Sequence, residues 1–391
     1  MSGGSAAAER LKVPAEAVWW AVLPLVLHVP SLYAIFRFVP NPWPAGALYL
    51  ALALGGSWYA LVPSRRAALI AALDRRWMFW CGLAVITLLT LIIYSYADAR
   101  KTSGLGSDND DGLITGAQSL VRTGNSYAMR LYTGNPISAG PGWILLVAPL
   151  SLTGLYGLLT PLAIAAAAFA ARTGGTSWGA INLALALLFS SLAAWHMTVT
   201  GLDYIPLMLL LVAVTLGLAE ARSPAVLVVL TLALGLLGTA RIVFLYWPVL
   251  VAFALVPVRG WKVAISVGLA ATAFALVLDL WSWATAPGFF PPLHVLGKGQ
   301  GYAAASGYLF PAGTIALCAV TGALMLANWR RWPALLHLGL GVSVPLLCTG
   351  LGAAWAVGAA GELSASAIVA ATLILALLLL APITPATRGA A

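Results

Sequence analysis

Apolar runs of about 20 residues recur along this chain, and they limit its fold more than any other feature. A helix of that length spans the roughly 30 Å hydrocarbon core of a bilayer. Hydrophobic residues make up 62% of the 391 residues and charged residues only 8%. Since helices satisfy all their backbone groups within lipid, the chain is predicted to be an all-α polytopic membrane protein. Residues 1–391 are expected to form a single transmembrane domain.

The apolar runs predict about twelve transmembrane helices. Glycines and a proline interrupt the run between 223 and 258, where the number of spans is least defined. The expected spans are 17–37, 45–63, 77–97, 142–171, 177–196, 204–220, 223–239, 243–258, 262–285, 309–328, 333–357 and 364–382.

The basic residues predict the orientation of the spans. The net charge is +9, and a cytoplasmic N terminus leaves only seven of the 20 Lys and Arg residues on the outer side. This distribution follows the positive-inside rule, so the charge requires no nucleic-acid partner. We expect an integral protein of a bacterial inner membrane, with both termini in the cytoplasm. Two polar segments, 98–141 and 286–308, would then form external loops that face the periplasm or exterior.

The first external loop contains the most concentrated charge in the chain. Asp108, Asp110 and Asp111 place three carboxylates within four residues. The stretch that follows, 112–123, has apolar residues at helical, one-sided spacing, which predicts a short amphipathic helix on the membrane surface. Gly124 is the expected C-terminal stop. Helix capping accounts for one carboxylate, but adjacent like charges repel, so at least one is expected to act in function.

This pattern resembles the first external loop of GT-C glycosyltransferases, which use polyprenyl-phosphate sugars. In the relatives of aminoarabinose and protein-O-mannosyl transferases, an acidic pair precedes a short amphipathic helix, a glycine and a proline-bearing turn. Here Asp110 and Asp111 match the acidic pair, and Gly124 follows Asp110 by 14 positions. The segment from Asn135-Pro136 to Pro141-Gly142 occupies the turn.

The resemblance implies an inverting enzyme of the GT-C type. It would move a sugar from a polyprenyl-phosphate donor to a glycan, lipid or protein acceptor at the outer face. Such a transfer needs a base for the proton of the acceptor hydroxyl. The resemblance points to Asp110 as this base, with Asp108 and Asp111 in support.

Other residues are expected to bind the substrates. Tyr132 and Asn135 lie in the turn and would bind the donor or acceptor sugar. Asp203 begins a predicted span, where it acts either as a helix cap or as a second acid on the sugar.

Positive charge is needed where the phosphate leaves, and Arg241, Lys298 and His294 are the candidates. Arg241 lies in an apolar stretch, where an arginine either faces a cavity or partner or extends to the lipid headgroups. The sequence Asp108-Asn109-Asp110 also supplies oxygen ligands for a divalent cation, Mg or Mn.

Two other function classes remain open. A transporter or flippase would have ionisable residues near the bilayer midplane and matched discontinuous helices. A lipid-linked glycan polymerase or ligase would depend on external arginines and a histidine, a role that Arg241 and His294 could fill. Neither a P-loop nor a nucleophile elbow is present, so NTP hydrolysis and serine or cysteine catalysis have no support.

Overall fold

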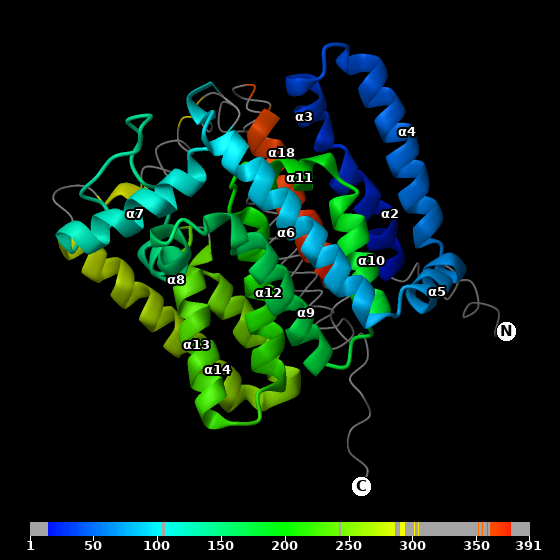
Figure 1. Cartoon of the computed structure of the whole chain (residues 1–391). Coiled ribbons are helices and arrows are strands. Elements are labelled where there is room, and N and C mark those ends of the chain that lie inside the picture. The colour runs from blue at the N-terminus through cyan, green and yellow to red at the C-terminus, as the bar shows by residue number, and fades with distance from the viewer. Residues whose placement is uncertain are drawn as a thin grey trace, which may run out of the picture.

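The structure is a computed structural model that describes 15–103, 106–241, 244–285, 290–293 and 360–376, with the single positions 301, 304, 351, 354 and 358. Every regular element within these residues is helical, as the sequence predicts (Figure 1). The predicted span 309–328, nearly all of 333–357 and the end of 364–382 lie outside the described residues.

The helices follow one another closely along the chain. Their order is α2 (Ala15–His28), α3 (Ser31–Phe38), α4 (Pro42–Leu61), α5 (Pro63–Ala72), α6 (Arg76–Asp98), η1 (Lys101–Ser103), α7 (Asn109–Thr123), α8 (Pro141–Leu152), η2 (Tyr156–Leu158), α9 (Leu159–Thr173), α10 (Trp178–Phe189), α11 (Leu192–Val199), α12 (Tyr204–Glu220), α13 (Pro224–Gly238), α14 (Trp247–Thr285), η4 (Pro291–Leu293) and α18 (Ala360–Leu375).

Several of these helices are long and apolar enough to cross a membrane. Within the described residues there are four: Trp20–Phe38, Arg76–Asp98, Tyr156–Thr173 and Val258–Thr285. The number rises to six if α4 with α5, and α10 with α11, each count as one bent span. The total of twelve spans therefore stays a prediction, while the class of helical membrane protein agrees with the structure.

The chain bends sharply at two places, at the end of the predicted span 45–63 and within the predicted span 177–196. The chain turns by 86° between α4 and α5 and by 84° between α10 and α11. The second bend leaves backbone N–H groups to be satisfied by side chains, since a helix break exposes them. Tyr49 Oη accepts from the Leu192 N–H at 3.3 Å, and Ser31 Oγ accepts from the Ala193 N–H at 3.1 Å. His28 joins this network at 3.0 Å from Tyr49 Oη, so it is a hydrogen-bonded core residue.

The predicted span 142–171 is wrong as a single helix. It divides into α8 and α9 at Gly154, which has φ +72°, a conformation that favours glycine. At about 1.5 Å per residue, α8 is too short to cross a bilayer. Hydropathy missed this break because both sides of the turn are apolar. The predicted boundary between 243–258 and 262–285 agrees better, since α14 is kinked at Gly260.

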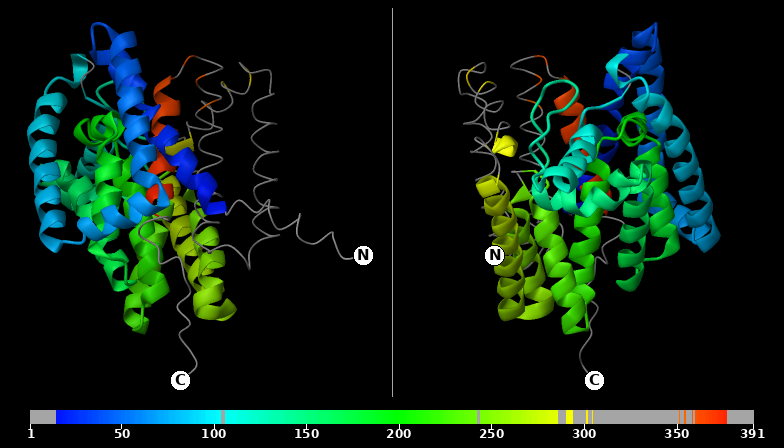
Figure 2. Two further views of the ribbon diagram at one scale, coloured as in Figure 1. Left: turned by 90° about the vertical axis from the view of Figure 1, so that its right-hand side faces the viewer. Right: turned by 60° about the vertical axis from the view of Figure 1, so that its left-hand side comes forward.

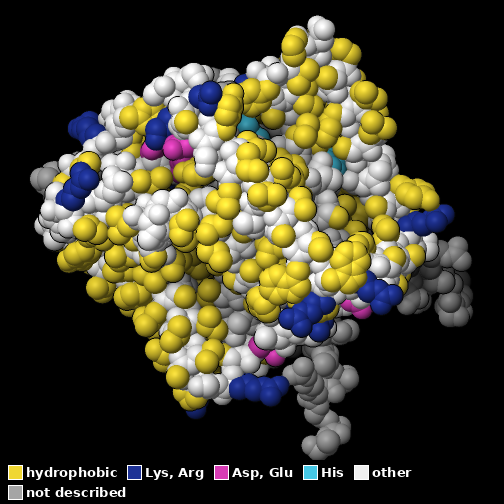
Figure 3. Space-filling model, in the orientation of Figure 1, with side chains coloured by type: hydrophobic (Ala, Val, Ile, Leu, Met, Phe, Trp, Pro, Cys, Tyr) yellow, Lys and Arg dark blue, Asp and Glu magenta, His cyan; other side chains and the backbone are white. Residues whose placement is uncertain are grey.

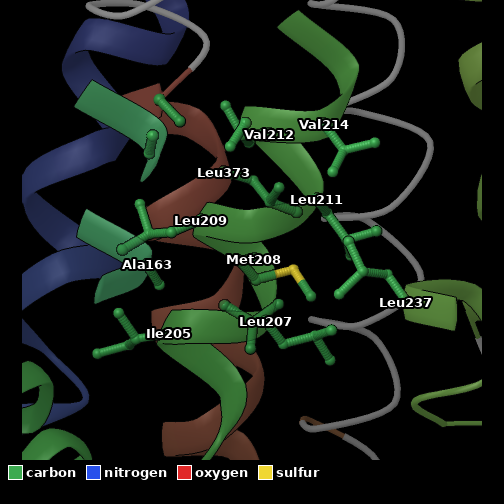
Figure 4. Packing of buried hydrophobic residues seen from close by; sticks show 14 of the residues in the cluster. Ala163, Ile205, Leu207, Met208, Leu209, Leu211, Val212, Val214, Leu237 and Leu373 are labelled. Carbon is green, nitrogen blue, oxygen red and sulfur yellow. The ribbon is translucent and has the colours of Figure 1, made fainter. Parts of the chain in front are cut away.

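The hydrophobic core is organised around α12. Leu207 and Leu211 of this helix are fully buried, and α9, α13 and α18 pack around it (Figure 4). On helices α4, α6 and α14, by contrast, large apolar side chains are exposed: Leu52, Leu88 and Leu269 are each more than half exposed. Such apolar exposure suits a lipid environment, because lipid takes the place of the missing protein contacts.

Helix ends gather at two ends of the molecule. We call one of them the α7 end, because α7 lies there beside the ends of several other helices (Figures 1 and 2). Asn125 Nδ2, just after α7, donates to the carbonyl of Thr285 at the end of α14. At the other end, Asn182 Nδ2 donates to the carbonyls of Leu73 and Arg75, which joins α10 to the α5–α6 connection. A largely hydrophobic surface separates the two ends (Figure 3).

Candidate functional site

The acidic run begins α7, and this helix confirms the amphipathic helix that the sequence predicts. It ends at Gly124, whose φ of +73° and N–H bond to Leu120 O at 2.9 Å make the expected stop. Leu113 and Ala117 are fully buried on one face. That face packs on α8, where a Cβ added to Gly116 would lie 2.8 Å from Ile144. Helix α7 therefore packs against the helical core.

Capping does not account for the three carboxylates. Asp108 is the N-cap residue, yet its side chain makes no capping hydrogen bond. The Asn109 N–H is instead satisfied by Ser107 Oγ at 3.1 Å. Asp110 and Asp111 lie in the first turn, where the helix dipole favours negative charge. Each of these two has partners from elsewhere in the chain.

Asp110 is the most deeply buried of the three, with 1% of its surface exposed. Tyr94 near the end of α6 donates to its Oδ2 at 2.8 Å. Oδ1 is buried and has no hydrogen-bond partner among the described residues. Gly201 lies directly beside this carboxyl, since a Cβ added there would be 2.8 Å from Cγ of Asp110.

The surroundings change the proton affinity of Asp110. Burial raises its pKa to about 7, against 3.8 in water, and the nearby Asp111 charge adds to this rise. The hydrogen bond from Tyr94 works in the opposite direction, because it favours the charged form. The carboxyl therefore exchanges its proton near neutral pH.

Asp111 is held by a different partner. Lys101 Nζ lies 2.5 Å from its Oδ1 and 3.1 Å from Asp98 Oδ1. Burial raises the pKa of Asp111, although Lys101 opposes that rise. The same ammonium lies 5.4 Å from the ring of Tyr132, which is half exposed. This arrangement joins the end of α6 to the turn after α7.

Asp203 and Arg241 form a buried ion pair. Arg241 donates to Asp203 Oδ1 at 2.9 Å, and the side chains are 12% and 0% exposed. Trp143 Nε1 donates to the other carboxylate oxygen at 2.7 Å. Arg241 also donates to Ser138 Oγ at 2.8 Å and lies 5.7 Å from the ring of Tyr204. Arg241 was expected either to face a cavity or partner or to extend to the lipid headgroups, and the structure shows the partner, Asp203. Asp203 itself makes no side-chain capping hydrogen bond to α12.

A close contact between backbones fixes this pair. The Gly140 N–H donates to Ala240 O at 3.2 Å, and the Trp143 N–H donates to Thr239 Oγ1 at 3.2 Å. A Cβ at Gly140 would lie 1.7 Å from Thr239 O, so only glycine permits this approach. The start of α8 and the end of α13 thereby hold Trp143 and Arg241 against Asp203.

A small polar cavity of about 60 Å³ lies between α7, the turn after it and Arg241. It brings together Asp108, Asn135 and Arg241, which the sequence analysis had assigned to separate roles. Asn109, Gly112, Leu131, Pro136, Ser138 and Ala139 complete its lining.

The other predicted residues are more dispersed. Tyr132 lies beside Lys101 and does not line the cavity. Lys298 and His294, with most of the loop 286–308, lie outside the described residues. Phe290 from that loop is described and packs on Tyr127, with ring centroids 5.4 Å apart.

Asp108 and Asp110 have different surroundings, and the Mg or Mn site expected at these residues stays a prediction. Asp108 lines the cavity near Arg241, while Asp110 contacts Tyr94 and Gly201. Across the described part of the chain, no group of three or more His, Cys, Asp or Glu side chains is placed to hold a metal ion.

The sequence analysis missed several residues of this site. Tyr94 and Lys101 hold two of the aspartates, and Trp143 and Ser138 hold the ion pair. Polar or aromatic residues at the end of an apolar run were the available signal, but they are common at membrane interfaces. Nothing in the sequence links Gly201 to Asp110.

No family model, curated protein or solved structure matches this chain.

Proposed function

We propose that this protein is an inverting membrane glycosyltransferase of the GT-C type. It would transfer a sugar from a polyprenyl-phosphate donor to a glycan, lipid or protein acceptor. One observation carries the proposal: Asp110 is a buried carboxyl with a pKa near 7 on a short helix at one end of a bundle of apolar helices. A general base works best when its pKa is near the operating pH.

Asp110 would act as the base through Oδ1, the oxygen without a partner among the described residues. The acceptor hydroxyl gives its proton to this oxygen while its own oxygen attacks the anomeric carbon. The bond from that carbon to the donor phosphate breaks, and the phosphate leaves with the electron pair. Tyr94 holds the other carboxylate oxygen, which orients the base.

Asp111 would support this step through Lys101. The Lys101 ammonium partly balances the charge of Asp111 and Asp98, so that not all the carboxylates repel Asp110. Lys101, just after α6, also lies beside the ring of Tyr132, in the turn after α7. Tyr132, whose side chain is half exposed, would contact the sugar from this turn.

The apolar helices support a lipid-borne donor. Leu88, Ile92 and Tyr96 of α6 are more than half exposed and follow one another at four-residue spacing, so they form one exposed face that runs to the end of this helix. A donor in the bilayer would reach the α7 end along such a surface. The proposal includes the predicted orientation, with the α7 end facing the periplasm or exterior of a bacterial inner membrane and both termini in the cytoplasm.

The two alternative classes gain no specific support. A transporter calls for charges at the bilayer midplane, whereas the ion pairs of the described residues around Asp110 and Asp203 lie at the α7 end. A polymerase or ligase would depend on external arginines and a histidine; Arg241 is paired with Asp203, and His294 lies outside the described residues.

The test is transfer of labelled sugar from a panel of polyprenyl-phosphate donors by the purified full chain. Wild type should consume at least one donor, and Asp110→Asn should lose activity by about 10²-fold or more. Glu220→Gln, at the opposite end of α12, is the matched control and should retain activity. An Asp110→Asn variant as active as wild type rejects the base, and failure of every donor rejects the function. EDTA in the same assay tests for a metal.

A further inference from the structure

The cavity beside Arg241 has no role in the proton transfer proposed for Asp110. The polar residues of its lining are Asp108, Asn109, Asn135, Ser138 and Arg241. These groups come from α7, from the turn after it and from the end of α13. They supply both hydrogen-bond donors and acceptors within one small space.

The charges around this cavity oppose the binding of an anion. Arg241 is the cation in its lining, and Asp203 already lies 2.9 Å from that guanidinium. Asp108 adds a second carboxylate, in the lining itself. A phosphate placed here would therefore lie beside the Asp108 carboxylate and a cation whose charge Asp203 already balances. Like charges at such distances repel strongly where little water is present.

A neutral group with hydroxyls fits the same lining. A hydroxyl both donates and accepts, so it can donate to Asp108 and accept from Asn135 or Arg241. The cavity volume is about 60 Å³. A small cavity of this kind holds water-sized polar groups, such as a hydroxymethyl group or two neighbouring hydroxyls of a sugar.

Gly112 allows the space to be tested without disturbing the fold. It is buried and lines the cavity, and a Cβ added there would meet no atom within 4 Å. A methyl group on residue 112 would therefore enter the cavity. Alanine favours a helix over glycine by about 1 kcal/mol, so Gly112→Ala should not weaken α7.

We propose that this cavity is a subsite for a hydroxyl-bearing edge of the transferred or accepting sugar, and that Arg241 serves there as a fixed hydrogen-bond donor. The proposal rests on the proposed function. It also moves Arg241 from the donor phosphate, its expected ligand, to the sugar.

The experiment measures equilibrium binding, without turnover, by the purified full chain in detergent. The probes are labelled methyl glycosides of common hexoses and pentoses, with inorganic phosphate tested separately. At least one glycoside should bind saturably to wild type, and Gly112→Ala should weaken that binding at least ten-fold. Gly82→Ala is the matched control, because its Cβ also meets no atom within 4 Å but lies on α6, away from the cavity. This control should bind as wild type does.

Three results would overturn the subsite: no glycoside binds, Gly112→Ala binds as tightly as wild type, or phosphate binds and is lost in Gly112→Ala. The last result would make the cavity an anion site. Transfer assays on the same preparations separate this outcome from the function itself. Sugar binding sensitive to Gly112→Ala without any transfer rejects the function and keeps the subsite. Transfer with an unchanged KM in Gly112→Ala rejects the subsite and keeps the function.

Discussion

The ion pair between Asp203 and Arg241 leads to a quantitative prediction about stability. Asp203 is fully buried and the Arg241 side chain is 12% exposed. Replacing Arg241 by Met would leave the Asp203 carboxylate buried, with Trp143 as its remaining donor. Removing one partner of a buried pair costs about 3–5 kcal/mol. Arg241→Met should therefore lower the free energy of unfolding by about that amount.

A second variant isolates the buried charge as the cause. In Asp203→Asn/Arg241→Met no charge is buried, and the Asn oxygen can still accept from Trp143. We expect this double variant to regain more than half of the lost stability, which a double-mutant cycle measures.

The assay is reversible unfolding in mixed detergent micelles, followed by helical circular dichroism. Lys101→Met is the comparison, because its partners Asp98 and Asp111 are more accessible and the loss should be about 1 kcal/mol. Two results would show that the buried charge is not the cause: Arg241→Met loses no more unfolding free energy than Lys101→Met, or the double variant is no more stable than Arg241→Met.

Two further predictions concern the surroundings of Asp110. Gly201→Ala should lower the free energy of unfolding by about 2–5 kcal/mol, because it combines a left-handed backbone with crowding of Asp110. Gly175→Ala should lower it by only about 1–2 kcal/mol, because Gly175 has the same backbone conformation but its added Cβ meets no atom. Equal losses of unfolding free energy in the two variants would contradict this. The free energy of unfolding should also depend on pH. The folded protein keeps the Asp110 proton up to about pH 7, whereas the unfolded chain loses it near pH 3.8. Wild-type stability should therefore fall between these two pH values and level off above them. Asp110→Asn should show a smaller fall between pH 3.8 and about pH 7, and an unchanged fall would contradict the raised pKa.

The local parts of the site could be predicted from the sequence. The spacing of apolar residues after the acidic run predicted α7, and Gly124 predicted its end, because both depend on neighbouring residues alone. The extended apolar runs likewise predicted helices. The break at Gly154 was missed, because hydropathy reports composition and not the direction of the chain.

The long-range parts of the site could not be predicted in this way. Asp203 and Arg241 are 38 residues apart, and Ser138 lies 103 residues from Arg241. Their contact depends on how α8, α12 and α13 pack, which is set by shape rather than by local pattern. The sequence therefore indicated Asp108, Asn135 and Arg241 as candidates, while their common cavity needed the three-dimensional arrangement.

The most direct test of Asp110 as the base is the pH dependence of the transfer rate. The rate of wild type should rise with pH and level off with a midpoint near 7, because the base acts in its deprotonated form. Tyr94→Phe should move that midpoint upward, since Tyr94 donates to the charged carboxylate. Two results together would contradict the role of Asp110 as the base: the midpoint is unchanged in Tyr94→Phe, and the Asp110→Asn variant remains active.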